Sequence, residues 1–145
     1  MRFIIIFLTM LVSNSAFAAD VTVEMLDKDA DGNRMVYSQE IVEIAVGSTV
    51  TWVSTDKFHN FHNVHNVEMI ASPNDMKFVS KGAKEASITF DTPGIYYYGC
   101  KVHKGEGMIG LVVVGGDTSN KMQVEKAKTV GKSKDKLKSL LAKLQ

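Results

Sequence analysis

Apolar and polar residues alternate in short runs along most of the chain, and glycine, proline or asparagine separates many of the runs. Alternation with a period of two is typical of β-strands that bury one face. Ser87-Ile88-Thr89-Phe90 is the clearest case, whereas Leu111-Val112-Val113-Val114 predicts a strand buried on both faces. The predicted strands are Val21–Met25, Ile41–Val46, Thr49–Val53, Val67–Ile70, Ser87–Phe90, Ile95–Gly99 and Ile109–Val114.

Turn residues connect these runs and indicate how the strands are joined. Gly47-Ser48 predicts a hairpin turn, and Pro93-Gly94 predicts a corner between two further strands. Short strands with turns at this spacing are typical of an antiparallel β-sandwich. We therefore predict an all-β fold for residues up to about 114.

The pattern changes after Gly115-Gly116, where lysine becomes frequent. Residues Lys121–Val130 and Ser133–Leu144 predict two helices separated by Gly131. The second helix carries one apolar stripe at helical spacing, which consists of Leu137, Leu140, Leu141 and Leu144. So short a stripe predicts packing on the sandwich more than it predicts a basic helix that binds a membrane surface or a partner. Ser133 is the predicted N-cap.

The N-terminus has the features of a cleaved secretory signal. A positive start at Arg2 precedes the apolar run Phe3–Val12, and Ala16-Phe17-Ala18 offers a cleavage site. The run is about half of the roughly 20 residues that span a bilayer, so we do not expect a membrane anchor. We predict a signal peptide over 1–18 and one soluble exported domain over 19–145, with strands at about 21–114 and helices at about 120–144.

The charge balance predicts neither a nucleic-acid partner nor a membrane partner. The chain has 17 basic and 16 acidic residues, and removal of residues 1–18 leaves 16 of each because Arg2 is the only charge in that segment. The lysine-rich tail lacks the interleaved aromatic residues typical of a nucleic-acid surface.

Cys100 is the single cysteine, so no disulfide can form within the chain. Exported proteins ordinarily use cysteines in pairs, and an immunoglobulin-type disulfide is excluded for the same reason. An exported lone thiol survives best when it is buried or bound to a metal.

Cys100 begins a short segment that carries three soft donors, with His103 and Met108 following it. A cysteine, two histidines and a distant methionine form the copper site of blue-copper electron carriers. Gly105 and Gly107 would let the backbone bring Met108 under the other donors. Zinc is the rival metal, but it rarely accepts a thioether. Each residue alone could be an ordinary core or surface residue, although the combination favours a metal.

The second histidine must come from elsewhere in the chain. His59, His62 and His65 recur at intervals of three residues just beyond the strand that carries Trp52. In a sandwich, this segment can meet the Cys100 loop at one end. The residues alone leave all three histidines open as the missing donor.

These features resemble the pseudoazurins, small periplasmic proteins of the cupredoxin family, over about residues 21–144. The C-x-x-H-x-x-x-x-M loop from Cys100 to Met108 is the most specific match. The supporting matches are Val46 to Trp52, Thr55-Asp56-Lys57, His65-Asn66-Val67-Glu68, Pro93-Gly94-Ile95-Tyr96 and the two C-terminal helices.

The resemblance implies a Greek-key cupredoxin sandwich with two C-terminal helices and one copper ion bound by His65, Cys100, His103 and Met108. Asn66 would brace the two ligand segments. The family implies a monomeric periplasmic electron carrier, not an enzyme, that docks transiently with nitrite reductase, c-type cytochromes or related redox proteins through the surface around His103. The lysines that could ring this surface are Lys57, Lys77, Lys81, Lys101 and Lys104.

Three features depart from the family pattern. The His-Asn triplets look like insertions, so counting from Lys57 selects His59, whereas matching the downstream strand selects His65, which we prefer. Val102 stands where proline is common, which restores a backbone N–H near Cys100. Glu106 places a negative charge near the predicted docking surface.

Three other functions compete with electron transfer. An exported copper-binding or delivery protein could use the extra histidines to capture the metal. A copper enzyme would need an open coordination position or further metal ligands. A metal-free adhesive sandwich would leave the unpaired cysteine unexplained. We predict the electron carrier, with copper delivery as the alternative.

Overall fold

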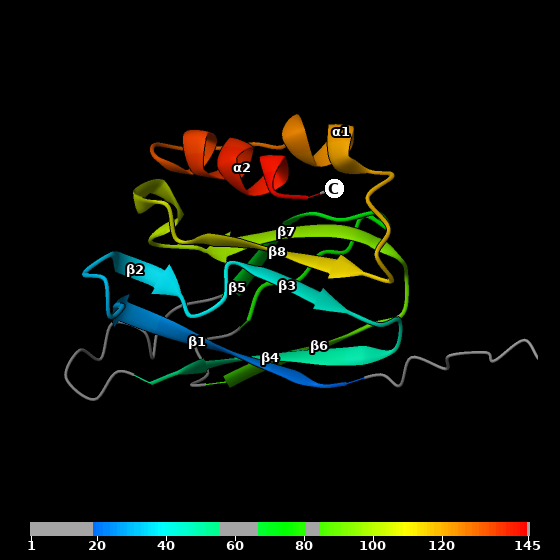
Figure 1. Ribbon diagram of the computed structural model, residues 1–145, viewed down its shortest axis with the longest axis horizontal. Helices are drawn as coiled ribbons and strands as arrows, with labels where there is room; N and C mark the ends of the chain where they lie inside the picture. Colours follow the sequence, from blue (N-terminus) through cyan, green and yellow to red (C-terminus); the bar gives the residue numbers. More distant parts are fainter. Residues whose placement is uncertain (1–18, 56–66, 81–84, 145) are drawn as a thin grey trace, which may run out of the picture.

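The computed structural model describes residues 19–55, 67–80 and 85–144. They form two stacked β-sheets, with two helices covering the outer face of one sheet (Figure 1). The strands are Val21–Lys28 (β1), Arg34–Tyr37 (β2), Ile41–Ile44 (β3), Ser48–Ser54 (β4), Val67–Ala71 (β5), Glu85–Phe90 (β6), Gly94–Cys100 (β7) and Ile109–Val114 (β8). The helices are Lys121–Glu125 (α1) and Ser133–Ala142 (α2).

The predicted all-β sandwich with C-terminal helices is confirmed. One sheet has the strand order β2-β1-β4-β6, and the other has the order β3-β8-β7-β5. Each strand predicted from the sequence has a counterpart, and β2 is an additional strand. Ser87–Phe90 alternates between exposed and buried positions, and β8 is buried throughout, as their patterns predict.

The pairing differs from a purely antiparallel sandwich in two places. Strand β1 runs parallel to β4, and β3 runs parallel to β8. Gly47, with φ of +86°, does turn the chain, but β3 and β4 belong to different sheets. The predicted hairpin at Gly47-Ser48 is therefore wrong, because the turn carries the chain from one sheet to the other.

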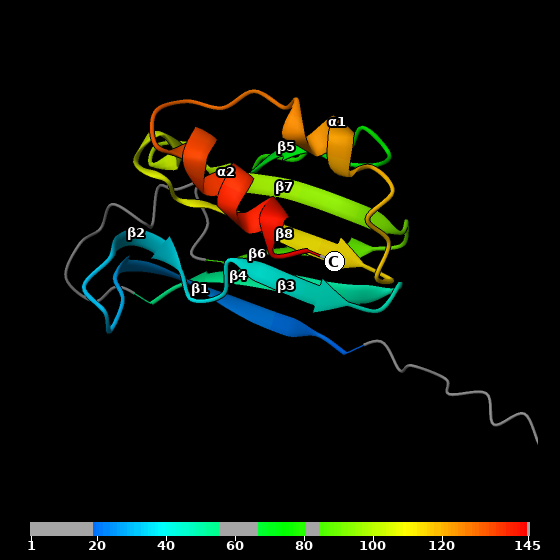
Figure 2. The same ribbon diagram turned by 45° about the horizontal axis from the view of Figure 1, so that its top comes forward.

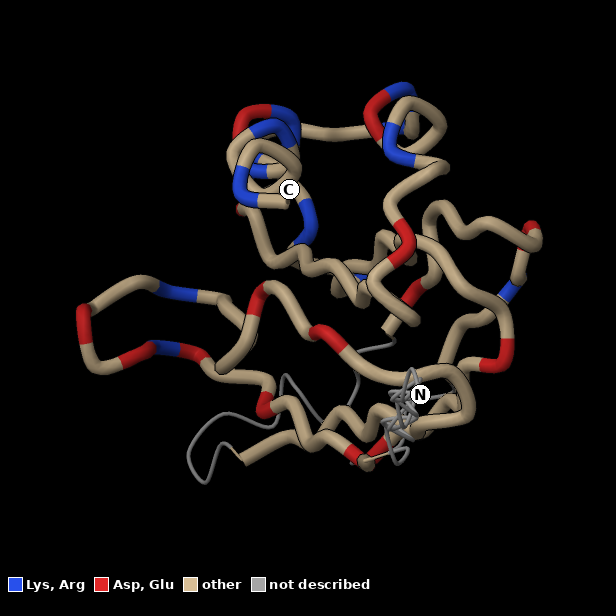
Figure 3. Tube along the Cα trace, turned by 45° about the vertical axis from the view of Figure 1, so that its right-hand side comes forward, with Lys and Arg blue, Asp and Glu red and all other residues tan. Residues whose placement is uncertain are grey.

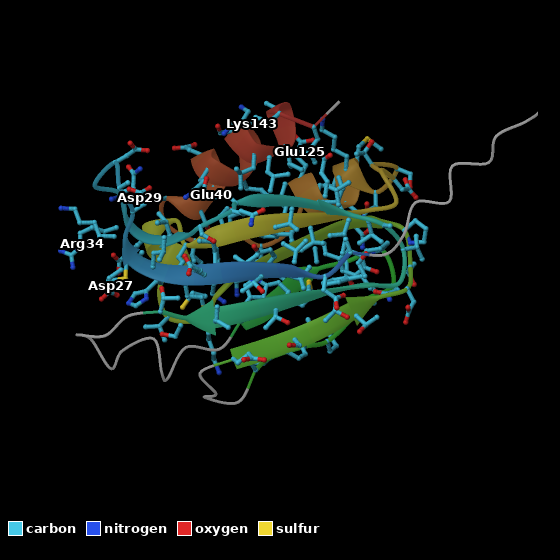
Figure 4. All side chains as sticks on the ribbon, turned by 60° about the horizontal axis from the view of Figure 1, so that its bottom comes forward. Asp27, Asp29, Arg34, Glu40, Glu125 and Lys143 are labelled. Atoms are coloured by element: carbon cyan, nitrogen blue, oxygen red, sulfur yellow. The ribbon has the colours of Figure 1, made fainter. Side chains whose placement is uncertain are left out.

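Strand β2 is a short edge strand that pairs antiparallel with β1. The connection is closed by Asp29, whose carboxylate accepts hydrogen bonds from the backbone amide and the side-chain amide of Asn33, both at 2.8 Å. Figure 4 shows Asp27, Asp29 and Arg34 gathered at this end of the sandwich.

Aromatic side chains fill the space between the sheets. The ring of Trp52 meets Tyr98 edge to face at 5.0 Å between centroids, and Phe90 meets Tyr96 in the same way at 4.7 Å. The Tyr96 hydroxyl donates to the carbonyl oxygen of Thr92 at 2.8 Å, which fastens the corner before β7. Burial of large rings in these geometries contributes strongly to the stability of a sandwich core.

The helices form a third layer over β7 and β8, as Figures 1 and 2 show. The predicted leucine stripe is buried against these strands, with Leu137, Leu140 and Leu141 in α2. Leu144 is also buried, but it lies two residues beyond Ala142, where α2 ends before the predicted Leu144. Helix α1 ends at Glu125, five residues before the predicted end at Val130. The Val130 backbone is instead bonded to the Ser133 hydroxyl.

Lysines are concentrated on the helical layer, while acidic residues are spread over the strands and the β1–β2 connection (Figure 3). No helix within the described residues is long and apolar enough to span a membrane. The predicted signal peptide over 1–18 lies outside the described residues.

Candidate metal centre

Strand β7 delivers Cys100 to one end of the sandwich, and the chain returns into β8 through the segment 101–108, here called the ligand loop. The amide of Cys100 donates to the carbonyl of Met108 at 3.0 Å, which closes the base of the loop. The amides of Glu106 and Met108 both donate to the carbonyl of His103, at 2.9 and 3.2 Å. These bonds fold eight residues into a compact turn that includes the 3-10 helix Lys104–Glu106.

Gly107 provides the reversal that the sequence predicts. Its φ is +99°, a conformation that costs little only for glycine, and its amide donates to the carbonyl of Lys104 at 3.0 Å. The next residue, Met108, is then fully buried in the same core cluster as Cys100. Gly105 does not adopt a left-handed φ, so the left-handed conformation of this reversal falls on Gly107.

Cys100 and His103 bring a sulfur and a ring nitrogen together. The Sγ atom of Cys100 lies 3.9 Å from Nδ1 of His103. Donors about 2.3 and 2.1 Å from one ion, with a trigonal angle between them, lie about 3.8 Å apart. The separation therefore fits two ligands of one metal ion, and the soft sulfur favours copper.

The surroundings of Cys100 act on its thiol in opposite directions. Burial raises the pKa of the Cys100 thiol, while the backbone amides of His103 and Val102 and the charge of Lys104 lower that pKa, with a smaller total effect. The thiol is consequently a weak acid in the metal-free protein. A metal ion that binds the thiolate must displace its proton.

Val102 lies on the surface next to this site and is 62% exposed. Its amide is one of the two that act on the sulfur. The sequence therefore predicts correctly that valine supplies a backbone N–H near Cys100.

Strand β5 adjoins Cys100 on the other side. Val67 is the ladder partner of Cys100, and the next residue, Glu68, pairs with Gly99. The amide of Val67 also donates a hydrogen bond to the hydroxyl oxygen of Ser80 at 2.9 Å. The start of β5 is therefore held from two sides, by the ladder with Cys100 and by Ser80.

Several predicted site residues lie outside the described residues. They are Lys57, His59, His62, His65, Asn66 and Lys81. Within the described ranges, no three His, Cys, Asp or Glu side chains gather into a metal-binding group. The ligand loop itself offers two such donors and the thioether of Met108.

The three described lysines of the predicted docking ring differ in their surroundings. Lys77 and Lys101 are exposed. Lys104 is half-buried and its ammonium group forms an ion pair with Glu68, which the sequence pattern does not predict. This ion pair ties the ligand loop to β5 and partly neutralises one charge of the predicted ring. Glu106 is exposed, as expected for a charge on this surface.

The family model for copper-binding proteins of the plastocyanin/azurin type matches residues 23–115. The chain belongs to this plastocyanin/azurin family. The match contains the ligand loop and all of the sandwich except the first two residues of β1, and it ends before α1. It confirms the predicted cofactor, one copper ion, because copper binding defines the family.

Among members of the plastocyanin/azurin family, pseudoazurins resemble the chain over nearly its whole length. The pseudoazurin of Paracoccus pantotrophus is 34% identical over 128 residues, which are 88% of this chain and 86% of the relative. The pseudoazurin of Methylorubrum extorquens is 32% identical over 134 residues, or 90% of this chain and 85% of the relative. The crystal structure of Hyphomicrobium denitrificans pseudoazurin is 33% identical with a TM-score of 0.76, covering 88% of this chain and 99% of that chain. The predicted resemblance to pseudoazurins is confirmed.

Proposed function

We propose that the protein is a periplasmic blue-copper electron carrier, with His65, Cys100, His103 and Met108 as its metal ligands. The observation that carries the proposal is the 3.9 Å separation of Cys100 Sγ and His103 Nδ1 at the end of β7, in a chain of a copper-binding family. Bound copper supplies a reversible one-electron change. The protein's part is to hold the donors in one arrangement.

The compact ligand loop supports a carrier because electron transfer is fastest when ligands hardly move between oxidation states. Cys100 is fixed by its ladder with Val67 and by its amide bond to Met108. His103 is fixed through its carbonyl, which receives two amide hydrogen bonds. Preorganised groups of this kind keep their geometry without reorganisation at the moment of transfer.

We infer that His65 is the second histidine ligand from its distance along the chain to Val67. Two residues can span at most about 7 Å between Cα atoms, which keeps His65 near the strand position that faces Cys100. His62 and His59 are five and eight residues away, so chain length constrains them less. Asn66, between His65 and Val67, is the proposed brace between the two ligand segments.

His103 is the proposed route for the electron. It is half-buried, unlike the fully buried Cys100 and Met108, and it lies between the exposed Val102 and the paired Lys104. An imidazole edge at the surface brings a partner's redox centre close without admitting a substrate to the metal. This arrangement supports a carrier that is not an enzyme.

The proposed partners are periplasmic redox proteins, such as nitrite reductase or c-type cytochromes, that dock transiently with a monomeric carrier. Exposed Val102 would supply an apolar contact beside His103, and Lys77 and Lys101 would supply positive charge. The export features of residues 1–18 support the periplasm as the location.

Copper delivery is the second candidate, because the triplet of His59, His62 and His65 could capture a metal ion. The two functions differ in how firmly the ion is held. A carrier keeps its ion when challenged with a chelator, whereas a delivery protein releases it readily.

An optical and electrochemical test separates these possibilities. The copper-loaded mature protein should show an intense thiolate-to-copper band, reversible one-electron voltammetry and slow loss of the ion to a chelator. Cys100→Ser should lose the intense band while retaining its β circular-dichroism spectrum. Rapid loss of the ion with no reversible wave would favour delivery and contradict the carrier.

A further inference from the structure

The turn that leads into α2 is held by one buried serine. The Ser133 hydroxyl accepts a hydrogen bond from the amide of Val130 at 2.9 Å and donates to the carbonyl of Val130 at 2.6 Å. The prediction of Ser133 as N-cap is therefore wrong, because Lys132 occupies the N-cap position, no side chain caps the helix, and the Ser133 hydroxyl bonds the preceding turn. The backbone of residues 130–133 is thereby fixed before the helix begins.

This fixed turn contacts the ligand loop through the backbone. The amide of Lys132 donates to the carbonyl of Gly105 at 3.0 Å. Figures 1 and 2 show the connection between β7 and β8 lying beside the start of α2. Gly105 lies between His103 and Met108 in sequence, so the contact reaches the loop between two proposed metal ligands.

Gly131 makes the contact possible. A β-carbon at this position would lie 2.3 Å from the carbonyl oxygen of Gly105 and 3.2 Å from its carbonyl carbon, and both atoms belong to the backbone. A side chain at residue 131 would therefore require the loop and the turn to move apart. The φ of Gly131, +55°, is also one that other residues rarely adopt.

Further contacts from α2 continue along the same side of the loop. A β-carbon at Gly107 would meet the side chains of Lys132 and Lys136, at 3.7 and 3.5 Å. Lys136 forms an ion pair with Glu40, whose carbonyl accepts the amide of Leu111 in β8 at 2.8 Å. The start of α2 is thus connected to the strand that follows the ligand loop as well as to the loop.

We propose that Gly131, Lys132 and Ser133 are positioning residues of the metal site, which hold the ligand loop through the Gly105 carbonyl. Their hydrogen bond to the ligand loop ends on the Gly105 carbonyl. By fixing the loop between His103 and Met108, they keep these two donors in place when copper binds and when its oxidation state changes. This inference rests on the proposed ligand set. The segment lies beyond residue 115, so the part of the chain that matches the family model does not include it.

The chain supplies a matched pair of variants. Gly131→Ala and Gly116→Ala both place a side chain at a positive φ, +55° and +66°, but a β-carbon at Gly116 would meet nothing within 4 Å. The two variants therefore share the backbone strain and differ in the clash with Gly105. Ser133→Ala is a third variant that loosens the turn without adding an atom.

The first readout is amide hydrogen exchange in the metal-free protein. Glu106, Gly107 and Met108 donate the hydrogen bonds that close the loop, so their exchange reports its opening. Gly131→Ala should speed their exchange by about tenfold or more, Ser133→Ala should change it in the same direction, and Gly116→Ala should leave it within about twofold. Equal rates in wild type, Gly131→Ala and Ser133→Ala would overturn the proposal.

The second readout is the spectrum of the copper-loaded protein. Gly131→Ala should change the position or relative intensity of the thiolate-to-copper bands, with the Gly116→Ala spectrum equal to that of wild type. Identical spectra in wild type, Gly131→Ala and Gly116→Ala would also overturn the proposal. If the wild type itself lacks the intense band, the proposed function fails, while the exchange comparison still decides whether the turn holds the loop.

Discussion

The rings of Tyr37 and Tyr98 meet edge to face across the core, with centroids 5.0 Å apart and planes inclined by 63°. The Tyr37 hydroxyl is buried and finds no hydrogen-bond partner within residues 19–55, 67–80 and 85–144. The Cys100 sulfur lies near enough to raise the pKa of Tyr37 further, in addition to burial and Tyr98. The core cluster that contains the buried Tyr37 hydroxyl therefore also contains Cys100, a proposed metal ligand.

Replacement of Tyr37 by phenylalanine should therefore be neutral or slightly stabilising. Removal of a buried hydroxyl without a partner eliminates a desolvation cost of about 1–3 kcal/mol, part of which the folded protein regains. Tyr96→Phe is the matched control, because the Tyr96 hydroxyl donates to Thr92, and its loss should cost about 0.5–1.5 kcal/mol. Denaturant unfolding of the metal-free proteins measures both changes. If Tyr37→Phe is as costly as Tyr96→Phe, the Tyr37 hydroxyl has a partner.

Because Tyr37 and Tyr98 are buried, the free energy of unfolding should fall at alkaline pH. Burial raises the pKa of Tyr37 and of Tyr98 well above the value of about 10 expected in the unfolded chain. Below about pH 9 both states keep these protons, so the two groups contribute no pH dependence. As the pH rises above about 10, the unfolded state loses protons that the folded state retains, and each tyrosine should lower the unfolding free energy by about 1.4 kcal/mol per pH unit.

Unfolding curves at several pH values between about 8 and 11 test this expectation, with tyrosinate absorbance recorded alongside. The slope should be smaller in Tyr37→Phe than in wild type by the contribution of one tyrosine. Ionisation of Tyr37 and Tyr98 in the folded protein near pH 10 would contradict the described burial.

The amide of Val102 should set part of the reduction potential. It acts on the Cys100 sulfur, and a hydrogen bond to that sulfur favours the reduced state, in which more negative charge rests on the site. Val102→Pro removes the N–H and should lower the potential, by roughly 40 mV if the difference in stabilisation is about 1 kcal/mol. Val102→Ala keeps the N–H and serves as the control. An unchanged potential in Val102→Pro, measured by voltammetry, would show that the Val102 amide does not set the reduction potential.

The elements that follow clear periodicity were predictable from sequence. The alternation in Ser87–Phe90, the fully apolar run in β8 and the leucine stripe of α2 each state which side chains are buried. The spacing of Cys100 and His103 also predicts their proximity. These features are local, so a short window of sequence contains the whole signal.

The features that escaped prediction depend on contacts between distant backbone groups. Strand β2 has only four residues, and its residue Met35 has φ of +52°, so its pattern is weak. The parallel pairings of β1 with β4 and of β3 with β8 leave no mark on either strand's own pattern. The bond from Lys132 to Gly105 joins two main-chain groups. Its one trace in the sequence is Gly131, which reads equally well as a simple break between two helices.

The ligand set is the central claim, and spectra of three histidine variants test it most directly. Copper-loaded mature protein should be compared with His59→Ala, His62→Ala and His65→Ala by optical absorption and electron paramagnetic resonance. We predict that His65→Ala alone loses the native thiolate-to-copper band, because His65 lies two residues before Val67, the ladder partner of Cys100. A native band in His65→Ala, with loss of the band in His59→Ala or His62→Ala instead, would contradict it.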